Sequence, residues 1–138
     1  MKNIRCISIA LIEHQSKLLV TKAFEPKKNE YFHRPIGGQI EFGETAITAL
    51  RREFLEELNV TLYNIQQLAV IENLFEYMRK PKHELVFLFK ADIIEDEFYK
   101  RKELKILDDE NVELLWISKK DFKSGKEIIY PSGILDYL

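Results

Sequence analysis

The chain has 138 residues, of which 46% are apolar and 32% charged, and its formal net charge at pH 7 is -2. This length supports one hydrophobic core and leaves no room for a second, so we expect a single domain over residues 1–138. A nearly balanced charge lacks the basic excess of proteins that bind nucleic acids. We therefore expect no nucleic-acid partner.

Cysteine content and apolar segments bear on the compartment. The single cysteine, Cys6, cannot form an internal disulfide. Residues 1–13 contain a short apolar run, but no small-residue cleavage site follows it. No run approaches the roughly 20 apolar residues that a membrane-spanning helix needs. We expect a cytoplasmic protein with no membrane partner.

The first elements that the pattern predicts are two strands. Residues 4–12 and 17–24 are rich in apolar and β-branched side chains, as strands are. The polar residues 13–16 lie between these two runs. This arrangement predicts a β-hairpin at the start of the chain.

A glycine pair follows the predicted hairpin. Residues 31–35 form a short run that predicts an extended piece, and residues 40–42 predict another short strand. Gly37 and Gly38 stand between these two runs. Because glycine tolerates backbone conformations that other residues avoid, the pair predicts a tight bend of the chain.

The clearest helical pattern spans residues 45–58. Its apolar residues recur mostly at spacings of three and four, at Ala46, Ile47, Ala49, Leu50, Phe54 and Leu58. Thr45 is a favourable N-cap, and Asn59 is one of the few residues that accept the left-handed conformation in which helices often end. The pattern predicts an amphipathic helix with both ends defined.

The second half of the chain reads mainly as strands. Residues 62–77 and 84–94 are long β-rich runs on either side of residues 79–82, which predicts a long antiparallel hairpin. The remaining predicted elements are a strand and two short helices, at residues 112–117, 119–122 and 134–138. Strands on both sides of a central helix predict an α+β sandwich.

Three glutamates within the predicted helix share one face. Glu53, Glu56 and Glu57 are three and four residues apart, so their carboxylates project from the same two turns. Like charges at this spacing repel one another by about 0.2–0.5 kcal/mol per pair. A hard divalent cation would offset the repulsion, and magnesium suits a few carboxylates combined with substrate phosphates.

An acidic helix face alone is usually a solvated surface, so the residues before the helix matter. Gly37-Gly38 and then Gly43-Glu44 form a glycine-rich stretch that leads into the helix start. The N–H groups and the dipole at a helix start favour anions such as phosphate. Together the loop and the acidic face indicate a site for a metal and a diphosphate.

The same residues carry a family resemblance, at Gly38, Glu44, Arg52, Glu53, Phe54, Glu56, Glu57 and Val60. Their spacing resembles the Nudix box, G-x5-E-x7-R-E-U-x-E-E-x-G-U, in which U is apolar. The one departure is Asn59, where the family has glycine. Because asparagine tolerates the left-handed conformation, we expect a small loss of stability rather than a loss of function.

The resemblance implies a fold, a reaction and a cofactor. The fold would be an α/β/α sandwich around a mixed β-sheet. The reaction would be the attack of water on the pyrophosphate bond of a nucleoside diphosphate linked to another group. The cofactor would be Mg²⁺, with Mn²⁺ as a substitute.

By the same resemblance, Glu56 and Glu57 would be the main metal ligands. Glu53 would be a further ligand or the base that takes a proton from the attacking water. Gly38 would offer its backbone carbonyl to the metal, because a residue without a side chain allows close approach. These four residues are the expected metal site.

Further residues are candidates for positioning and for substrate binding. Arg52 would pair with a glutamate such as Glu44 and hold the acidic face in register. Arg34 can clamp a phosphate or can equally be an exposed surface arginine. Tyr77 stands where diadenosine-polyphosphate hydrolases carry a tyrosine, although it can also be a cross-strand packing residue.

Many family members use another carboxylate from outside the box. The acidic residues 108–110 precede the last predicted strand, and Glu110 is our first choice there. Residues 95–97 are the rival cluster. Either cluster can instead be ordinary solvated loop charge.

The substrate stays open at this stage. A dinucleoside polyphosphate, a nucleotide sugar or ADP-ribose, and a modified nucleoside triphosphate all fit the box. The alternative function is a catalytically inactive Nudix fold that senses ligands or binds proteins. A long exposed hairpin over residues 62–94 can also supply the interface of a homodimer.

Overall fold

The computed structural model describes residues 2–107 and 109–138, and for residue 110 the backbone alone. In chain order, with η marking 3-10 helices, the elements are β1 (Ile4–Leu11), β2 (Glu13–His14), β3 (Lys17–Glu25), β4 (Glu30–Gln39), α1 (Ala46–Leu58), β5 (Leu62–Tyr77), β6 (Lys80–Ile93), η1 (Asp96–Lys100), β7 (Lys105–Ile106), β8 (Asp109–Ser118), α2 (Lys119–Ser124) and η2 (Ser132–Tyr137). They include every strand and helix that the sequence predicted except the strand at residues 40–42.

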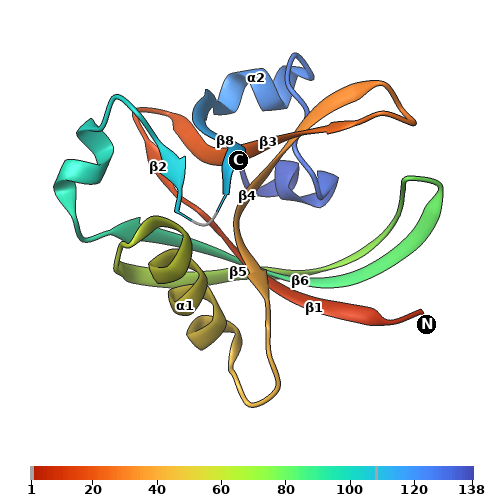
Figure 1. Cartoon of the computed structure of the whole chain (residues 1–138), viewed down its shortest axis with the longest axis horizontal. Helices are drawn as coiled ribbons and strands as arrows, with labels where there is room; N and C mark the ends of the chain where they lie inside the picture. The colour runs from red at the N-terminus through yellow and green to blue at the C-terminus, as the bar shows by residue number, and fades with distance from the viewer. Residues whose placement is uncertain (1, 108) are drawn as a thin grey trace.

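The described strands form one mixed sheet. Their order is β5-β6-β1-β4-β3-β8-β7, and β2 pairs with β3 at the side of this path. β1 and β6 run parallel, and the other neighbours are antiparallel. The α+β fold predicted from the sequence is confirmed, with α1 on one side of the strands and α2 with η2 on the other (Figure 1).

The glycine pair lies within β4, not in a bend between two short strands. β4 pairs with β3 through residues 30–35 and with β1 through residues 36–39. Gly37 has φ +154°, and a Cβ there would collide with the Ser8 carbonyl oxygen of β1. Glycine is needed because two strands meet closely, and residues 40–42 then leave the sheet as a loop.

The two predicted hairpins differ in detail from the structure. At the start of the chain the short β2 pairs with β3, while β1 pairs with β4 and β6 instead. The long hairpin turns at Met78 and Arg79, both at positive φ, rather than over residues 79–82. Positive φ at both central residues is the signature of the tight turns whose twist matches paired strands.

Helix α1 has both of its predicted ends. The Thr45 hydroxyl oxygen accepts a hydrogen bond of 3.1 Å from the backbone N–H of Thr48. Asn59 ends the helix in the left-handed conformation, at φ 54° and ψ 45°. An N-cap of this kind stabilises a helix by about 1 kcal/mol.

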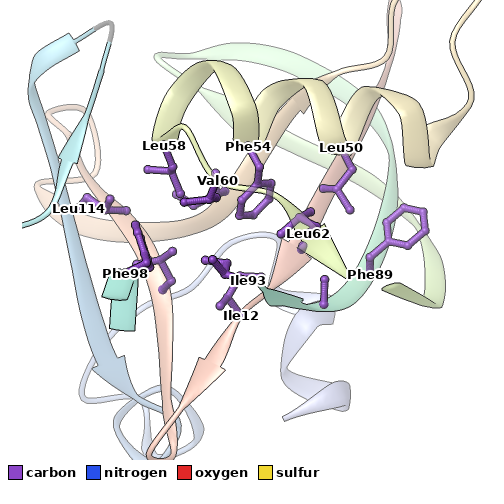
Figure 2. Close-up of a cluster of buried hydrophobic side chains, with 14 of the residues drawn as sticks. Ile12, Leu50, Phe54, Leu58, Val60, Leu62, Phe89, Ile93, Phe98 and Leu114 are labelled. Atoms are coloured by element: carbon purple, nitrogen blue, oxygen red, sulfur yellow. The ribbon is translucent and has the colours of Figure 1, made fainter. Parts of the chain in front are cut away.

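Two apolar clusters lie on opposite faces of the sheet. Figure 2 shows Leu50, Phe54 and Leu58 of α1 pointing into the first cluster, beside Phe98 of η1. Phe54 is completely buried, and replacing such a phenylalanine with alanine costs about 3–5 kcal/mol. The second cluster contains residues of α2 and η2, at Phe122 and Ile134.

Among the described residues, no helix is long and apolar enough to cross a membrane.

Candidate active site

Arg52 is the centre of the acidic face of α1. Its Nε and Nη2 donate to the two carboxylate oxygens of Glu44, at 2.7 and 2.9 Å. Its Nη1 donates to Glu53 at 2.9 Å and to Glu56 at 3.4 Å. Nη2 also reaches the Gln39 carbonyl oxygen at 3.0 Å, which ties the helix to the end of β4. The structure thus contains the ion pair expected between Arg52 and Glu44.

The electrostatics of this network favour charged partners. The hydrogen bonds from Arg52, together with one from the backbone N–H of Glu41, lower the pKa of Glu44 to about 2. The hydrogen bonds of Arg52 to Glu44 and Glu53, with the negative charge of Glu41, raise the pKa of Arg52 although desolvation opposes them. Glu44 is therefore ionised at neutral pH and anchors Arg52. Its oxygens are engaged by donors of the protein itself.

Gly38 faces the carboxylate of Glu53. A Cβ built on Gly38 would lie 2.5 Å from the carboxyl carbon of Glu53. Gly38 does not have positive φ, so glycine is required here by space and not by backbone conformation. The absence of a side chain allows the backbone of β4 to lie next to a carboxylate of α1.

Glu57 lies beside a second acidic residue that is far away in sequence. A hollow of about 270 Å³ is lined by Glu57, by Asp109 of β8 and by Gly37 of β4. The backbone N–H of Leu107 donates to the Glu57 carbonyl oxygen at 2.8 Å, which holds this loop against the end of α1. Asp109 is thus the described member of the predicted cluster 108–110 that reaches the box.

Other members of the two rival acidic clusters have different positions. Asp108 and the side chain of Glu110, our first choice from the sequence, lie outside the described residues. Glu95 accepts a hydrogen bond of 2.8 Å from the backbone N–H of Thr61, and Glu97 pairs with Arg101. Glu95 and Glu97 therefore take part in local structure, through Thr61 and Arg101.

The donors gathered around α1 fit a hard divalent cation. Glu53, Glu56 and Glu57 offer carboxylate oxygens, and Gly38 leaves room beside Glu53 that a Cβ would fill. Oxygen donors of this kind are those that magnesium prefers. In the described part of the chain, no three acidic, histidine or cysteine side chains are already drawn together as a complete set of ligands. Arg52 instead holds Glu53 and Glu56 by Nη1.

Arg34 and Tyr77 line a separate, larger cavity. This cavity has a volume of about 480 Å³ and lies between the outer ends of the hairpins β3–β4 and β5–β6. It shares Thr21 with the hollow beside Glu57, so the two spaces adjoin. The two candidate substrate-binding residues thus line one cavity, which adjoins the hollow beside Glu57.

Sequence reasoning missed Glu84, which also lines this cavity. Its carboxylate is 2% exposed and accepts a hydrogen bond of 3.1 Å from Nη2 of Arg34. A signal was present, because Glu84 occupies the same face of the strand as Val86 and Leu88. A charged residue in a buried alternating series needs a partner, and that requirement marks it.

Comparisons with known proteins agree with this architecture. A family model described as "NUDIX domain" matches residues 2–134. A NUDIX hydrolase from Nitrosomonas europaea has a TM-score of 0.66 and 17% identity, over 97% of this chain and 85% of that chain. A MutT NUDIX hydrolase from Burkholderia pseudomallei has a TM-score of 0.64 and 19% identity, over 86% of each chain. A mutator MutT protein from Bacillus halodurans has a TM-score of 0.64 and 18% identity, over 96% of this chain and 80% of that chain. A comparison with curated proteins gave no match.

Proposed function

This chain belongs to the NUDIX domain family of pyrophosphohydrolases, which act on phosphorus-containing acid anhydrides, and from that premise we propose its metal and its class of substrate. Members of the family generally use divalent metal ions. The metal is Mg²⁺, with Mn²⁺ as a substitute, and the substrate is a nucleoside diphosphate linked to another group. The bond that breaks is the pyrophosphate bond.

One observation carries this proposal. Glu57 of α1, Gly37 of β4 and Asp109 of β8 line one hollow, and Gly38 of β4 faces Glu53 of α1, although these segments are distant in sequence. Such a meeting of carboxylates has an electrostatic cost that a bound cation offsets. Arg52 offsets part of this repulsion at Glu53 and Glu56, and a bound cation would offset more of it, which supports a metal-dependent enzyme.

The residues that would hold the ion are Gly38, Glu53, Glu56 and Glu57. A bound magnesium ion lowers the pKa of water and neutralises charge that develops on phosphate oxygens. Arg52 keeps Glu53 and Glu56 on the side of α1 that faces β4. It is a positioning residue, because its donors are taken up by protein acceptors.

Two further residues complete the chemistry. Asp109 lines the same hollow as Glu57 and would accept a proton from an attacking water, a role for which Glu53 is also a candidate. Arg34 carries a guanidinium at the adjoining cavity and would bind a substrate phosphate. Glu110 stays a candidate for the same proton-accepting role as Asp109.

The test is hydrolysis of a panel of nucleotide derivatives, with released phosphate measured by coupled enzymes in magnesium and in EDTA. We expect magnesium-dependent turnover, and a fall in kcat of about 10²–10⁴-fold in Asp109→Asn. Glu57→Gln should lose most activity while remaining folded by circular dichroism. Glu97→Gln, a carboxylate paired with Arg101, is the matched control and should behave as wild type.

Each result bears on a different part of the proposal. No turnover on dinucleoside polyphosphates, nucleotide sugars, ADP-ribose or modified nucleoside triphosphates would overturn it in favour of a ligand-binding protein. Full activity in EDTA would show that hydrolysis does not require a metal ion. Loss in Glu110→Gln with full activity in Asp109→Asn would transfer the proton-accepting role to Glu110.

A further inference from the structure

Glu84 is a buried carboxylate held between two arginines. It lies on β6, and its neighbours are Arg34 of β4 and Arg5 of β1. The Arg34 contact is a hydrogen bond of 3.1 Å, and Nη1 of Arg5 lies 3.6 Å from the other carboxylate oxygen. Side chains of the two arginines are 32% and 51% exposed, against 2% for Glu84. The carboxylate is therefore buried, whereas the two arginine side chains that hold it are partly exposed.

Burial of this ion pair is poorly explained by stability alone. Removing charges from water costs free energy that the attraction between them often fails to return. Apolar residues of similar size would serve the core at least as well. The arrangement does achieve one thing, which is to fix the direction of a guanidinium that would otherwise sample many rotamers.

The wall of the cavity is aromatic on one side. Phe32 contacts Tyr77 edge-on, with ring centroids 6.3 Å apart, and Tyr130 at 5.4 Å. All three rings line the cavity. Aromatic faces of this kind bind planar rings by stacking, and nucleobases are bound in this way.

The charged residues that line the cavity include more cations than carboxylates. The cations around the cavity are Arg5, Lys28, Arg34 and Lys82. They outnumber its three carboxylates, of which Glu84 is engaged by arginines, Glu25 is engaged by backbone N–H groups and Glu76 is exposed. A ligand that fits therefore combines a planar ring with a negative charge.

We propose that Glu84 is the residue that sets the selectivity of this cavity, by holding Arg34 toward the phosphate of a nucleotide whose base lies against Phe32, Tyr77 and Tyr130. Glu84 does not touch the ligand and is a positioning residue. This inference rests on the proposed function for the identity of the ligand as part of a substrate. It is tested by binding, which does not require hydrolysis.

The experiment is calorimetric titration in EDTA with AMP, GMP, CMP and UMP and with the four matching nucleosides. For the base that binds best, we expect the monophosphate to bind wild type about tenfold more tightly than its nucleoside. In Glu84→Gln this advantage should fall below about threefold, with nucleoside binding unchanged. Glu72→Gln, an exposed carboxylate of the neighbouring strand, is the control and should keep the full advantage.

A second variant protects the test against misfolding of Glu84→Gln. Arg34→Lys keeps the positive charge and loses the planar fork, so it should show the same reduced advantage. In hydrolysis, either variant should raise KM with little change in kcat, whereas a general loss of structure would lower kcat as well.

The outcomes separate this inference from the proposed function. Absence of binding by all eight ligands, or an unchanged phosphate advantage in both variants, overturns the role of Glu84. Selective binding without any magnesium-dependent hydrolysis retains the role of Glu84 and overturns the enzyme instead.

Discussion

The carboxylate of Glu25 accepts a hydrogen bond of 2.7 Å from the backbone N–H of Met78, which links the turns of two hairpins. The same carboxylate also accepts from the backbone N–H groups of Lys27 and Lys28, in its own turn. Figure 1 shows the two tips reaching the same side of the molecule. Glu25 thus joins the two hairpins that form walls of the larger cavity.

Because of these hydrogen bonds to Glu25, the stability of the protein should depend on pH. Desolvation raises the pKa of Glu25, but the hydrogen bonds from Met78, Lys28 and Lys27 outweigh it, and the net effect is a pKa below the usual 4.5. A lowered folded pKa means that the stabilisation is present above pH 4.5 and is lost as the pH falls through the folded value. We expect Glu25→Gln to unfold at a lower Tm than wild type at pH 7, because a glutamine presents an N–H to donors.

Thermal unfolding at a series of pH values checks this expectation. The difference in Tm between wild type and Glu25→Gln should shrink below pH 4.5. Glu72→Gln serves as the control at an exposed position and should follow wild type throughout. A difference that is the same at pH 3 and pH 7 would show that the charge of Glu25 is not what holds the hairpins.

Arg52→Lys should impair catalysis more than stability. A lysine cannot make the paired bonds to Glu44 or reach Glu53, Glu56 and Gln39 at once. Loss of such positioning contacts around a metal site typically costs about 10–100-fold in metal affinity or activity. The measurement is the magnesium dependence of turnover. Arg51→Lys is the matched control, because Arg51 donates to the Leu62 carbonyl oxygen and not to the acidic face.

Gly38→Ala should lower both stability and activity, because its Cβ would collide with the side chain of Glu53. The added Cβ would lie 2.5 Å from the Glu53 carboxyl carbon, so Glu53 must move or β4 must shift. We expect a lower Tm and loss of turnover in Gly38→Ala. In the double variant Gly38→Ala/Glu53→Ala the clash is absent, so the Tm should recover while turnover does not. A Tm that stays low would locate the strain in the backbone instead.

The helix end at Asn59 should accept glycine and reject alanine. Asn59 has φ 54°, a conformation that costs a residue such as alanine roughly 1–2 kcal/mol. Asn59→Gly should therefore leave the free energy of unfolding unchanged or slightly raised, and Asn59→Ala should lower it by about 1 kcal/mol. Urea denaturation measures both values. Equal losses in the two variants would mean that the asparagine side chain itself is needed.

Helix α1 could be read from the sequence because its signals are local. Thr45, the apolar spacing and Asn59 define its ends and its buried face within a few turns. The carboxylates of the box are on that helix, so their grouping follows from helical geometry. The pairing of Arg52 with Glu44 spans eight residues and was equally accessible.

The features that the sequence analysis missed depend on contacts between distant segments. The continuity of β4 is set by Ser8 and other residues of β1, which no pattern around Gly37 reveals. The sequence included Asp109 in a candidate cluster, but its position at the same hollow as Glu57 depends on a loop that hydrogen-bonds to the end of α1. Glu84 meets Arg34 across two intervening strand pairings. Periodicity shows which way a side chain points and does not identify its partner.

β4 also sets the spacing between two candidate site residues. Arg34 and Gly38 lie four residues apart on this single strand, which corresponds to a separation of about 13 Å at the pitch of an extended chain. A paired strand does not stretch, so the fold fixes the distance between the backbone positions of Arg34 and Gly38. Under the functions proposed above, the enzyme would measure the length of its substrate, and a molecule with too short a span between base and scissile bond would be refused whatever its chemistry.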